Sequence, residues 1–351
     1  MRFLIKFNRK EVKVIVLFLV ALLVQINVAS VCPYSLESKE GSANLDVDTF
    51  QDSYVIPGRG EYEVIIYYPF NGSGKPYPAV IFAHGFCSCS SWHTWIGNYL
   101  ASMGYVTLVF TVPNRLSTDI QDWVDGIEEG IRYLEQLNNE SDLLGGLVNM
   151  SRLGVMGHSM GAMAALIAAS KNLNIKAVVS LAAPYMKEKQ YDEEYAEKIR
   201  SEIDWDSVLS ASGNLTKPVQ FQVGTLDAFA ADNAVKYFEA ANSSFKEFVT
   251  IEGGNHVQFL DDKVVLSIST LSGLISFIIP LLLTLDLETI IRIIMMFLTR
   301  NQGGIHIKII FVQKLVGAAI FFGLDLPATI SPREQQEKSS QNFLTFFDLY
   351  L

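Results

Sequence analysis

The sequence predicts an α/β fold, in which a mostly parallel central sheet carries helices on both faces. Strand-like and helix-like segments alternate from residue 62 to residue 251, as they do in such sheets. The run Ala79–Ala83 is continuously apolar, which is typical of a parallel strand buried on both faces. A Gly-x-Ser-x-Gly pentapeptide at 157–161 lies between a predicted strand and a predicted helix. The fold prediction therefore comes with a candidate site.

The predicted elements alternate in chain order. The strands are apolar or alternating runs, namely Tyr62–Tyr68, Ala79–Ala83, Tyr105–Val112, Leu153–Met156, Ile175–Ala183, Lys217–Val223 and Glu247–Ile251. The helices are amphipathic, Ala-rich or charged stretches, namely Trp92–Met103, Ile120–Leu137, Met160–Ser170, Lys187–Leu209, Asn233–Ala241 and Pro332–Leu351.

The composition excludes two broad classes of protein. Half of the 351 residues are hydrophobic and 18% are charged, which is too apolar for intrinsic disorder. The formal net charge is −10, and it becomes −14 (22 basic minus 36 acidic residues) without residues 1–30. Because an acidic surface repels phosphate, we expect no nucleic-acid partner.

The first 30 residues have the pattern of an export signal. Five basic residues between Arg2 and Lys13 precede the apolar run Val14–Val24, and small residues at 28–30 offer a cleavage point. A cleaved signal peptide or an uncleaved signal anchor would both place the rest of the chain outside the cytoplasm. Asn-x-Ser/Thr sequons agree with an exported glycoprotein; they begin at Asn71, Asn139, Asn149, Asn214 and Asn242.

A second apolar block interrupts the α/β pattern between residues 263 and 325. Val264–Leu285 contains no charge over 22 residues, about 33 Å as a helix and long enough to cross a bilayer. Ile305–Leu324 is also apolar but contains Lys308 and Lys314. The block is either a two-pass membrane hairpin or a lid of apolar helices, and membrane association is expected.

Ser159, at the centre of the pentapeptide, is the candidate nucleophile. A serine on a sharp turn from strand to helix needs small neighbours, which Gly157 and Gly161 supply. The amides at the start of the following helix would point toward the serine and stabilise negative charge that develops there.

The base and the acid follow by elimination among few candidates. The chain has five histidines, and His256 is the one that follows the last predicted strand, where a loop can return to Ser159. Asp227, directly after the strand ending at Val223, is the expected acid, with Asp232 as the fallback. The expected oxyanion donors are the backbone amides of Met160 and of Phe86, the latter in a loop that follows Ala83.

With these motifs the chain resembles the α/β-hydrolase superfamily, in the branch of dienelactone-hydrolase-like, cutinase-like and platelet-activating-factor-acetylhydrolase-like serine esterases. The resemblance covers roughly Val47–Asp261 and Pro332–Leu351, whose Gln-Gln and Phe-Phe pairs are similar to the terminal helix of that branch. It implies a triad of Ser159, Asp227 and His256, with no cofactor and no metal. The nucleophile here is serine rather than the cysteine of dienelactone hydrolase, and the apolar block replaces a short loop.

Four segments are therefore expected: 1–30 as signal, 31–262 as the hydrolase core, 263–325 as the apolar insertion and 326–351 as the terminal helix of the core. The expected protein is an exported, membrane-associated serine hydrolase of carboxylic esters, with lipid or other apolar esters favoured by the insertion. A peptidase or thioesterase would use the same triad, and a non-catalytic membrane interaction module on this fold is the other alternative.

Overall fold

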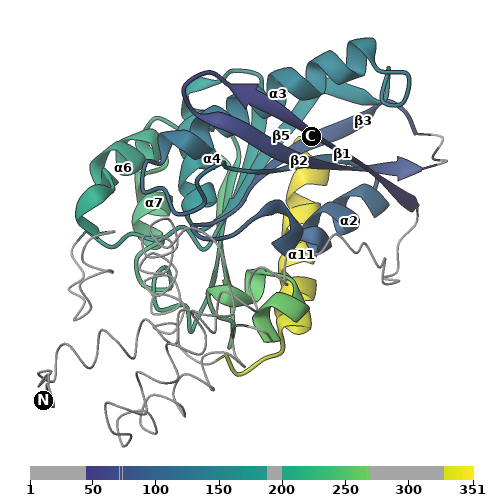
Figure 1. Ribbon diagram of the computed structural model, residues 1–351. Coiled ribbons are helices and arrows are strands. Elements are labelled where there is room, and N and C mark those ends of the chain that lie inside the picture. The colour runs from purple at the N-terminus through teal and green to yellow at the C-terminus, as the bar shows by residue number, and fades with distance from the viewer. Residues whose placement is uncertain (1–44, 71, 73, 188–199, 267, 269–327) are drawn as a thin grey trace, which may run out of the picture. The chain divides into compact units, whose positions relative to one another are not determined.

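One eight-stranded sheet organises the described part of the chain in the computed structural model, which covers residues 45–70, 72, 74–187, 200–266, 268 and 328–351 (Figure 1). The spatial order is β1-β2-β4-β3-β5-β6-β7-β8. The pairs β1–β2 and β2–β4 are antiparallel, and all the later pairs are parallel. The strands are β1 (Asp46–Ile56), β2 (Gly60–Phe70), β3 (Tyr77–Ala83), β4 (Val106–Thr111), β5 (Val148–His158), β6 (Ile175–Leu181), β7 (Val219–Gly224) and β8 (Lys246–Ile251).

The seven predicted strands are all present, as β2 to β8, and the predicted fold class is confirmed. The sequence did not indicate β1, because this edge strand has one buried residue, Tyr54, and no apolar run. Strand β5 is longer than predicted: it begins at Val148, which pairs with Tyr77, and its register with β3 shifts across the polar part 149–152 before pairing resumes at Leu153.

Helices cover both faces of the sheet. On one face, α3, α4, α6 and α7 contact one another in succession, and on the other face α2 contacts α11 (Figure 1). Their bounds are α2 (Thr94–Ser102), α3 (Gln121–Glu140), α4 (Met160–Lys171), α6 (Trp205–Gly213), α7 (Val235–Ala240) and α11 (Pro332–Tyr350), with short 3-10 turns at Ser90–Trp92 and Val257–Phe259.

One predicted helix is wrong in its described part. The expected Lys187–Leu209 helix does not run through residue 204, where Asp204 instead begins a new helix, α6, by accepting a hydrogen bond from the Ser207 amide. Aspartate competes for backbone amides in this way and so favours helix starts over helix interiors. Residues 188–199 of the prediction lie outside the described chain.

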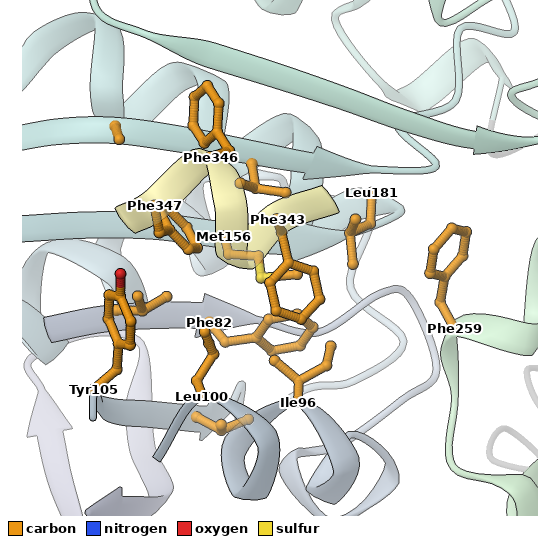
Figure 2. Packing of buried hydrophobic residues seen from close by; sticks show 14 of the residues in the cluster. Phe82, Ile96, Leu100, Tyr105, Met156, Leu181, Phe259, Phe343, Phe346 and Phe347 are labelled. Atoms are coloured by element: carbon orange, nitrogen blue, oxygen red, sulfur yellow. The ribbon is translucent and has the colours of Figure 1, made fainter. Parts of the chain in front are cut away.

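One hydrophobic core lies between the central strands and the helices α2 and α11. Alternate residues of β3, β5 and β6 point to the same face, among them Phe82, Met156 and Leu181. The terminal helix α11 lays Phe343 and Phe347 onto this face, beside Leu100 of α2 (Figure 2). Ser331 caps the helix by accepting from the Glu334 amide, and Pro332 occupies its first turn. The predicted terminal helix is thus an integral layer of the fold.

The chain divides into two compact units, and this sheet with its helices belongs to the one formed by Tyr34–Asp262 and Asp325–Leu351. The predicted export signal lies outside the described residues, as does nearly all of the apolar block, of which 263–266 and 268 are described. Within the described ranges, no helix has both the length and the apolar character needed to span a bilayer.

Removing the Phe343 ring should destabilise the fold, because this fully buried side chain fills the space between α11 and the sheet. For Phe343→Ala we expect a loss of about 3–5 kcal/mol in the free energy of unfolding, from lost apolar burial and the cavity left behind. Leu349→Ala, at a position 71% exposed on the same helix, should change it by less than about 0.5 kcal/mol. Denaturant unfolding measures both, and equal effects would contradict the packing described.

Candidate active site

Ser159 occupies a strained turn between β5 and α4. Its backbone has φ 55° and ψ −118°, a conformation rarely adopted by a residue with a side chain. The Ser159 amide donates to the Leu181 carbonyl at 2.9 Å, which extends the pairing of β5 with β6 into the turn. The turn thus presents the serine at the carboxyl end of the central strands, where α/β folds place their sites.

Two glycines make this turn sterically possible. A Cβ on Gly157 would lie 2.2 Å from the Gly161 carbonyl oxygen, and one on Gly161 would lie 2.1 Å from the Ala83 carbonyl oxygen. Neither contact can be relieved by a side-chain rotation, because the opposing atoms belong to the backbone. The Gly-x-Ser-x-Gly pattern is therefore required by backbone packing at both glycines.

The structure brings Ser159, His256 and Asp227 together in one hydrogen-bonded chain. His256 Nε2 lies 2.9 Å from Ser159 Oγ, and His256 Nδ1 lies 2.9 Å from Asp227 Oδ2. All three side chains are buried. Because the carboxylate accepts from Nδ1–H, the imidazole has its lone pair on Nε2, directed at the serine hydroxyl. The arrangement can move a proton from the serine oxygen to the ring.

The second carboxylate oxygen of Asp227, Oδ1, is bound by backbone amides. Asp227 Oδ1 accepts from the amides of Phe229 at 2.9 Å and Ala230 at 2.8 Å. These bonds leave Oδ2 to the histidine and fix the plane of the carboxylate. The Phe229 ring also packs edge-on against the His256 imidazole, with ring centroids 5.0 Å apart. The fallback residue Asp232 is exposed and takes no part in this chain of hydrogen bonds.

The loops that carry the acid and the base are bound directly to each other. The Leu226 amide donates to the Gly254 carbonyl at 2.9 Å, and the Gly253 amide donates to Thr225 Oγ1 at 3.0 Å. At Gly224 a Cβ would come within 2.3 Å of the Gly254 backbone. The separation of Asp227 from His256 is consequently determined by backbone contacts.

The histidine loop is also anchored to α2. Asp261 accepts from the amides of Thr94 and Trp95 and from the Thr94 hydroxyl, at 3.1, 3.0 and 2.8 Å. The indole of Trp95 donates back to the Phe259 carbonyl at 2.9 Å. Asp261 thereby caps a helix from a distant part of the sequence, and burial raises the pKa of its carboxyl despite these bonds.

The two expected oxyanion donors lie on either side of the serine. Met160 is the first residue of α4, where backbone amides have no partner within the helix. Phe86 lies in the turn Gly85–Ser88, which passes so close that a Cβ on Gly85 would be 3.0 Å from Ser159 Cβ. Cys87, next in this turn, has φ 59°, and its amide donates to the Arg115 carbonyl at 2.7 Å. That bond ties the turn to the loop after β4.

Three further histidines are buried behind the triad. His158, adjacent to the nucleophile, directs its ring to the histidine loop, and its Nε2–H donates to the His256 carbonyl at 3.0 Å. His93 contacts the Ser88 hydroxyl at 3.1 Å and packs against the His158 ring. His84 accepts from the Val112 amide at 3.1 Å. Burial lowers the pKa of His84 and of His93 to about 3, and burial together with the neighbouring His256 and His93 lowers that of His158 strongly. All three rings are neutral at ordinary pH.

Asp206, Cys87 and Cys89 take no part in the hydrogen bonds of the triad. Asp206 forms an exposed ion pair with Lys187, and Cys87 and Cys89 are buried. His306 and Asp192 are outside the described residues. Within those residues, no group of three potential metal ligands comes together.

The strand order, the serine turn and the positions of acid and base after β7 and β8 define an α/β-hydrolase fold. A model of the "PET hydrolase-like" family matches residues 33–219, more than half of the chain, and the chain belongs to this family. The expected place in the cutinase-like branch of the superfamily is thereby confirmed. The match includes Phe86, Ser159 and Met160; Asp227 and His256 lie beyond it.

Curated relatives agree with this family. The chain is 33% identical over 159 residues to a bis(hydroxyethyl) terephthalate hydrolase of Streptomyces coelicolor, across 45% of this chain and 48% of the relative. It is 26% identical over 195 residues to cutinase 1 of Thermobifida cellulosilytica, across 54% of this chain and 64% of the relative. A cutinase of Thermobifida fusca gives 26% identity over 195 residues, across 54% and 56%. The matched part is thus about half to two thirds of these relatives.

The buried histidines should make the fold sensitive to acid. The unfolded chain takes up a proton on each histidine near pH 6.5, whereas His84 and His93 resist it until about pH 3 in the folded state. Their contribution is complete above pH 6.5 and falls as the pH is lowered, by about 2 kcal/mol per histidine between about pH 7.5 and about pH 5. Denaturant unfolding at a series of pH values measures this loss.

A single variant isolates one of these contributions. His93→Gln removes one titrating ring and should make the acid-induced loss smaller by about 2 kcal/mol over the same interval. A loss of the same size in the variant and the wild type would show that His93 is not held neutral.

Proposed function

We propose that this protein is a serine hydrolase that cleaves carboxylic esters through an acyl-enzyme, with Ser159 as nucleophile, His256 as general base and acid, and Asp227 as the group that orients His256. The observation that carries the proposal is the continuous chain of hydrogen bonds from Ser159 Oγ through His256 to Asp227 Oδ2, each 2.9 Å long, at the start of α4.

In the proposed acylation, Ser159 Oγ attacks the ester carbonyl carbon while its proton passes to His256 Nε2. The carbonyl π electrons move to oxygen and form a tetrahedral oxyanion. His256 then gives the proton to the leaving alkoxide as the C–O bond breaks, which releases an alcohol and leaves the acyl group on Ser159. Water repeats the sequence, with its proton taken by His256 and returned to Ser159, and the acid is released.

The amides of Phe86 and Met160 are the proposed oxyanion donors. Met160 supplies an N–H at the positive end of α4, and the Phe86 turn passes directly over Ser159. Backbone donors held in this way are already oriented before the charge develops, and one such donor is worth roughly 10²–10³ in kcat in other acyl-transfer enzymes.

The names of the relatives favour esters over the other bonds that such a triad can cleave. The relatives are called cutinases and a bis(hydroxyethyl) terephthalate hydrolase, and all of these names denote hydrolysis of carboxylic esters. Apolar Met160 directly follows Ser159 and Phe86 lies in the turn that passes over it, which favours an apolar or aromatic acyl group. The peptidase and thioesterase alternatives therefore rank below the esterase, as does the non-catalytic module.

Export, attachment to a membrane and glycosylation remain part of the proposal on sequence evidence. The basic residues and apolar run before residue 30 support export, and the uncharged stretch 264–285 supports a membrane-associated insertion that favours lipid esters. Three sequon asparagines, Asn139, Asn214 and Asn242, are exposed, as glycosylation requires.

A fluorophosphonate probe tests the proposal. It should label the folded wild-type protein and leave Ser159→Ala unlabelled, because the probe reacts with an activated serine. Buried Ser180, on the neighbouring strand β6, offers the matched control: Ser180→Ala should still be labelled. A wild-type protein that folds but takes up no label would refute the proposed serine hydrolase activity.

A panel of substrates then distinguishes ester hydrolysis from the peptidase and thioesterase alternatives. We expect turnover of p-nitrophenyl butyrate and bis(hydroxyethyl) terephthalate that exceeds turnover of a matched peptide p-nitroanilide by at least about 100-fold, since amides are poorer acyl donors than esters. Faster cleavage of the anilide, or of an acyl thioester, would move the assignment to that class.

Asp227→Asn tests the role of the acid separately. The amide keeps an oxygen for the Phe229 and Ala230 amides but no longer accepts from His256 Nδ1–H, so the imidazole adopts the wrong tautomer. We expect kcat to fall by roughly 10³–10⁴ with a small change in KM. Asp232→Asn, at the exposed fallback position, should retain wild-type kcat, and the opposite pattern would identify Asp232 as the acid.

A further inference from the structure

The terminal helix contacts the histidine loop through one side-chain amide. Gln335 Oε1 accepts from the Asn255 amide at 2.9 Å, and Gln335 Nε2 donates to the Asn255 carbonyl at 2.9 Å. The glutamine therefore pairs with both backbone groups of Asn255, as a neighbouring β-strand would. Asn255 immediately precedes His256, and its carbonyl belongs to the peptide bond that joins the two residues.

The glutamine is enclosed on all sides. Gln335 is fully buried, and a Cβ on Gly254 would lie 2.4 Å from its Oε1. Neighbouring bonds fix the helix that carries it, because Gln258 Nε2 donates to the Ile330 carbonyl at 2.8 Å and Gln336 Nε2 donates to the Leu260 carbonyl at 2.8 Å. A buried amide with both ends paired and a glycine beside it has one available geometry.

The peptide on the other side of His256 is held as well. His158 Nε2–H donates to the His256 carbonyl, so side chains from two distant elements orient the peptide groups before and after the imidazole. These two peptide planes determine the φ and ψ of His256, and with them the direction of Nε2 toward Ser159 Oγ. A displacement of about 1 Å at such an atom can cost roughly 100-fold in rate.

We propose that Gln335 is a positioning residue for the reaction: its amide sets the Asn255–His256 peptide and so aims His256 Nε2 at Ser159. The inference rests on the proposed function, since it assigns to α11 a share in the triad's geometry. It also gives a role to a polar side chain on the buried face of α11, where Gln335 is in line with Ser339 and Phe343.

Two substitutions separate positioning from packing. Gln335→Met keeps the approximate volume but can neither accept from nor donate to Asn255. Gln335→Glu keeps the shape and the acceptor; its carboxyl can donate to the Asn255 carbonyl only while it is protonated, so the pair with Asn255 forms at low pH and is lost as the pH rises. Gln341→Glu, exposed on the same helix, introduces the same charge as a matched control.

The measurements are kcat and KM for p-nitrophenyl butyrate and the rate of fluorophosphonate labelling, each relative to wild type at the same pH. We expect Gln335→Met to lower kcat and the labelling rate at least tenfold at every pH, with KM changed by less than about twofold. Gln335→Glu should match wild type within about threefold at the lowest pH where wild type is active, and fall toward the Met variant as the pH rises. Gln341→Glu should follow wild type throughout.

The outcomes are distinguishable. Wild type that takes up no label overturns the proposed function and this inference with it. Labelled wild type with both Gln335 variants equal to it in kcat overturns the inference alone, as does a pH-independent loss in Gln335→Glu that merely parallels a loss of folded protein by circular dichroism. If Gln335→Met does not fold, the pH profile of Gln335→Glu decides, because at low pH that variant restores both hydrogen bonds.

Discussion

The contact between the first turn of α4 and the carboxyl end of β3 governs the arrangement of the whole site. Gly161 sits against the carbonyl groups of Ala83 and His84, at a distance that admits no side chain. This approach draws the start of α4 over the sheet and forces Ser159 into its positive-φ conformation. It also brings the turn that contains Phe86, which follows β3, close to Ser159 and Met160. The nucleophile and both proposed oxyanion donors are thus consequences of one backbone contact.

The position of His256 depends on a loop that is hydrogen-bonded to several neighbouring elements. The loop after β8 is bound to the acid loop through Gly254, to the start of α2 through Asp261, and to α11 through Gln335. Each of these anchors uses a backbone group or a fully paired side chain, so little of the loop's position depends on flexible surface contacts. Such redundancy is what a site needs if a hydrogen bond of 2.9 Å must be present before substrate arrives.

The three buried histidines make the free energy of unfolding depend on pH. Neutral imidazoles at 84, 93 and 158 supply donors and acceptors that apolar residues could not, and they hold the Gly85–Ser88 turn, the end of β4 and the histidine loop from inside. Burial lowers their pKa values, so protonation favours the unfolded chain. The same three histidines therefore supply the polar contacts behind the triad and lead us to expect a fold that loses stability in acid.

The sequence by itself determined the architecture and the members of the candidate site. Apolar runs and helical spacing identified β2 to β8, and chain order after Ser159 pointed to His256 and to Asp227, with Asp232 as the fallback, because few aspartates and histidines follow the right strands. The edge strand β1 and the break at Asp204 were missed, since their signals are a half-exposed alternation and a single capping side chain. Only the tertiary structure could decide how His256 is oriented toward Ser159. Gln335 and His158, which hold the peptide groups on either side of His256, are far from it in sequence, and Asp261 anchors its loop to Thr94 and Trp95, which are equally distant. Hydrogen bonds between distant segments follow no helical or strand period, so the sequence does not reveal them.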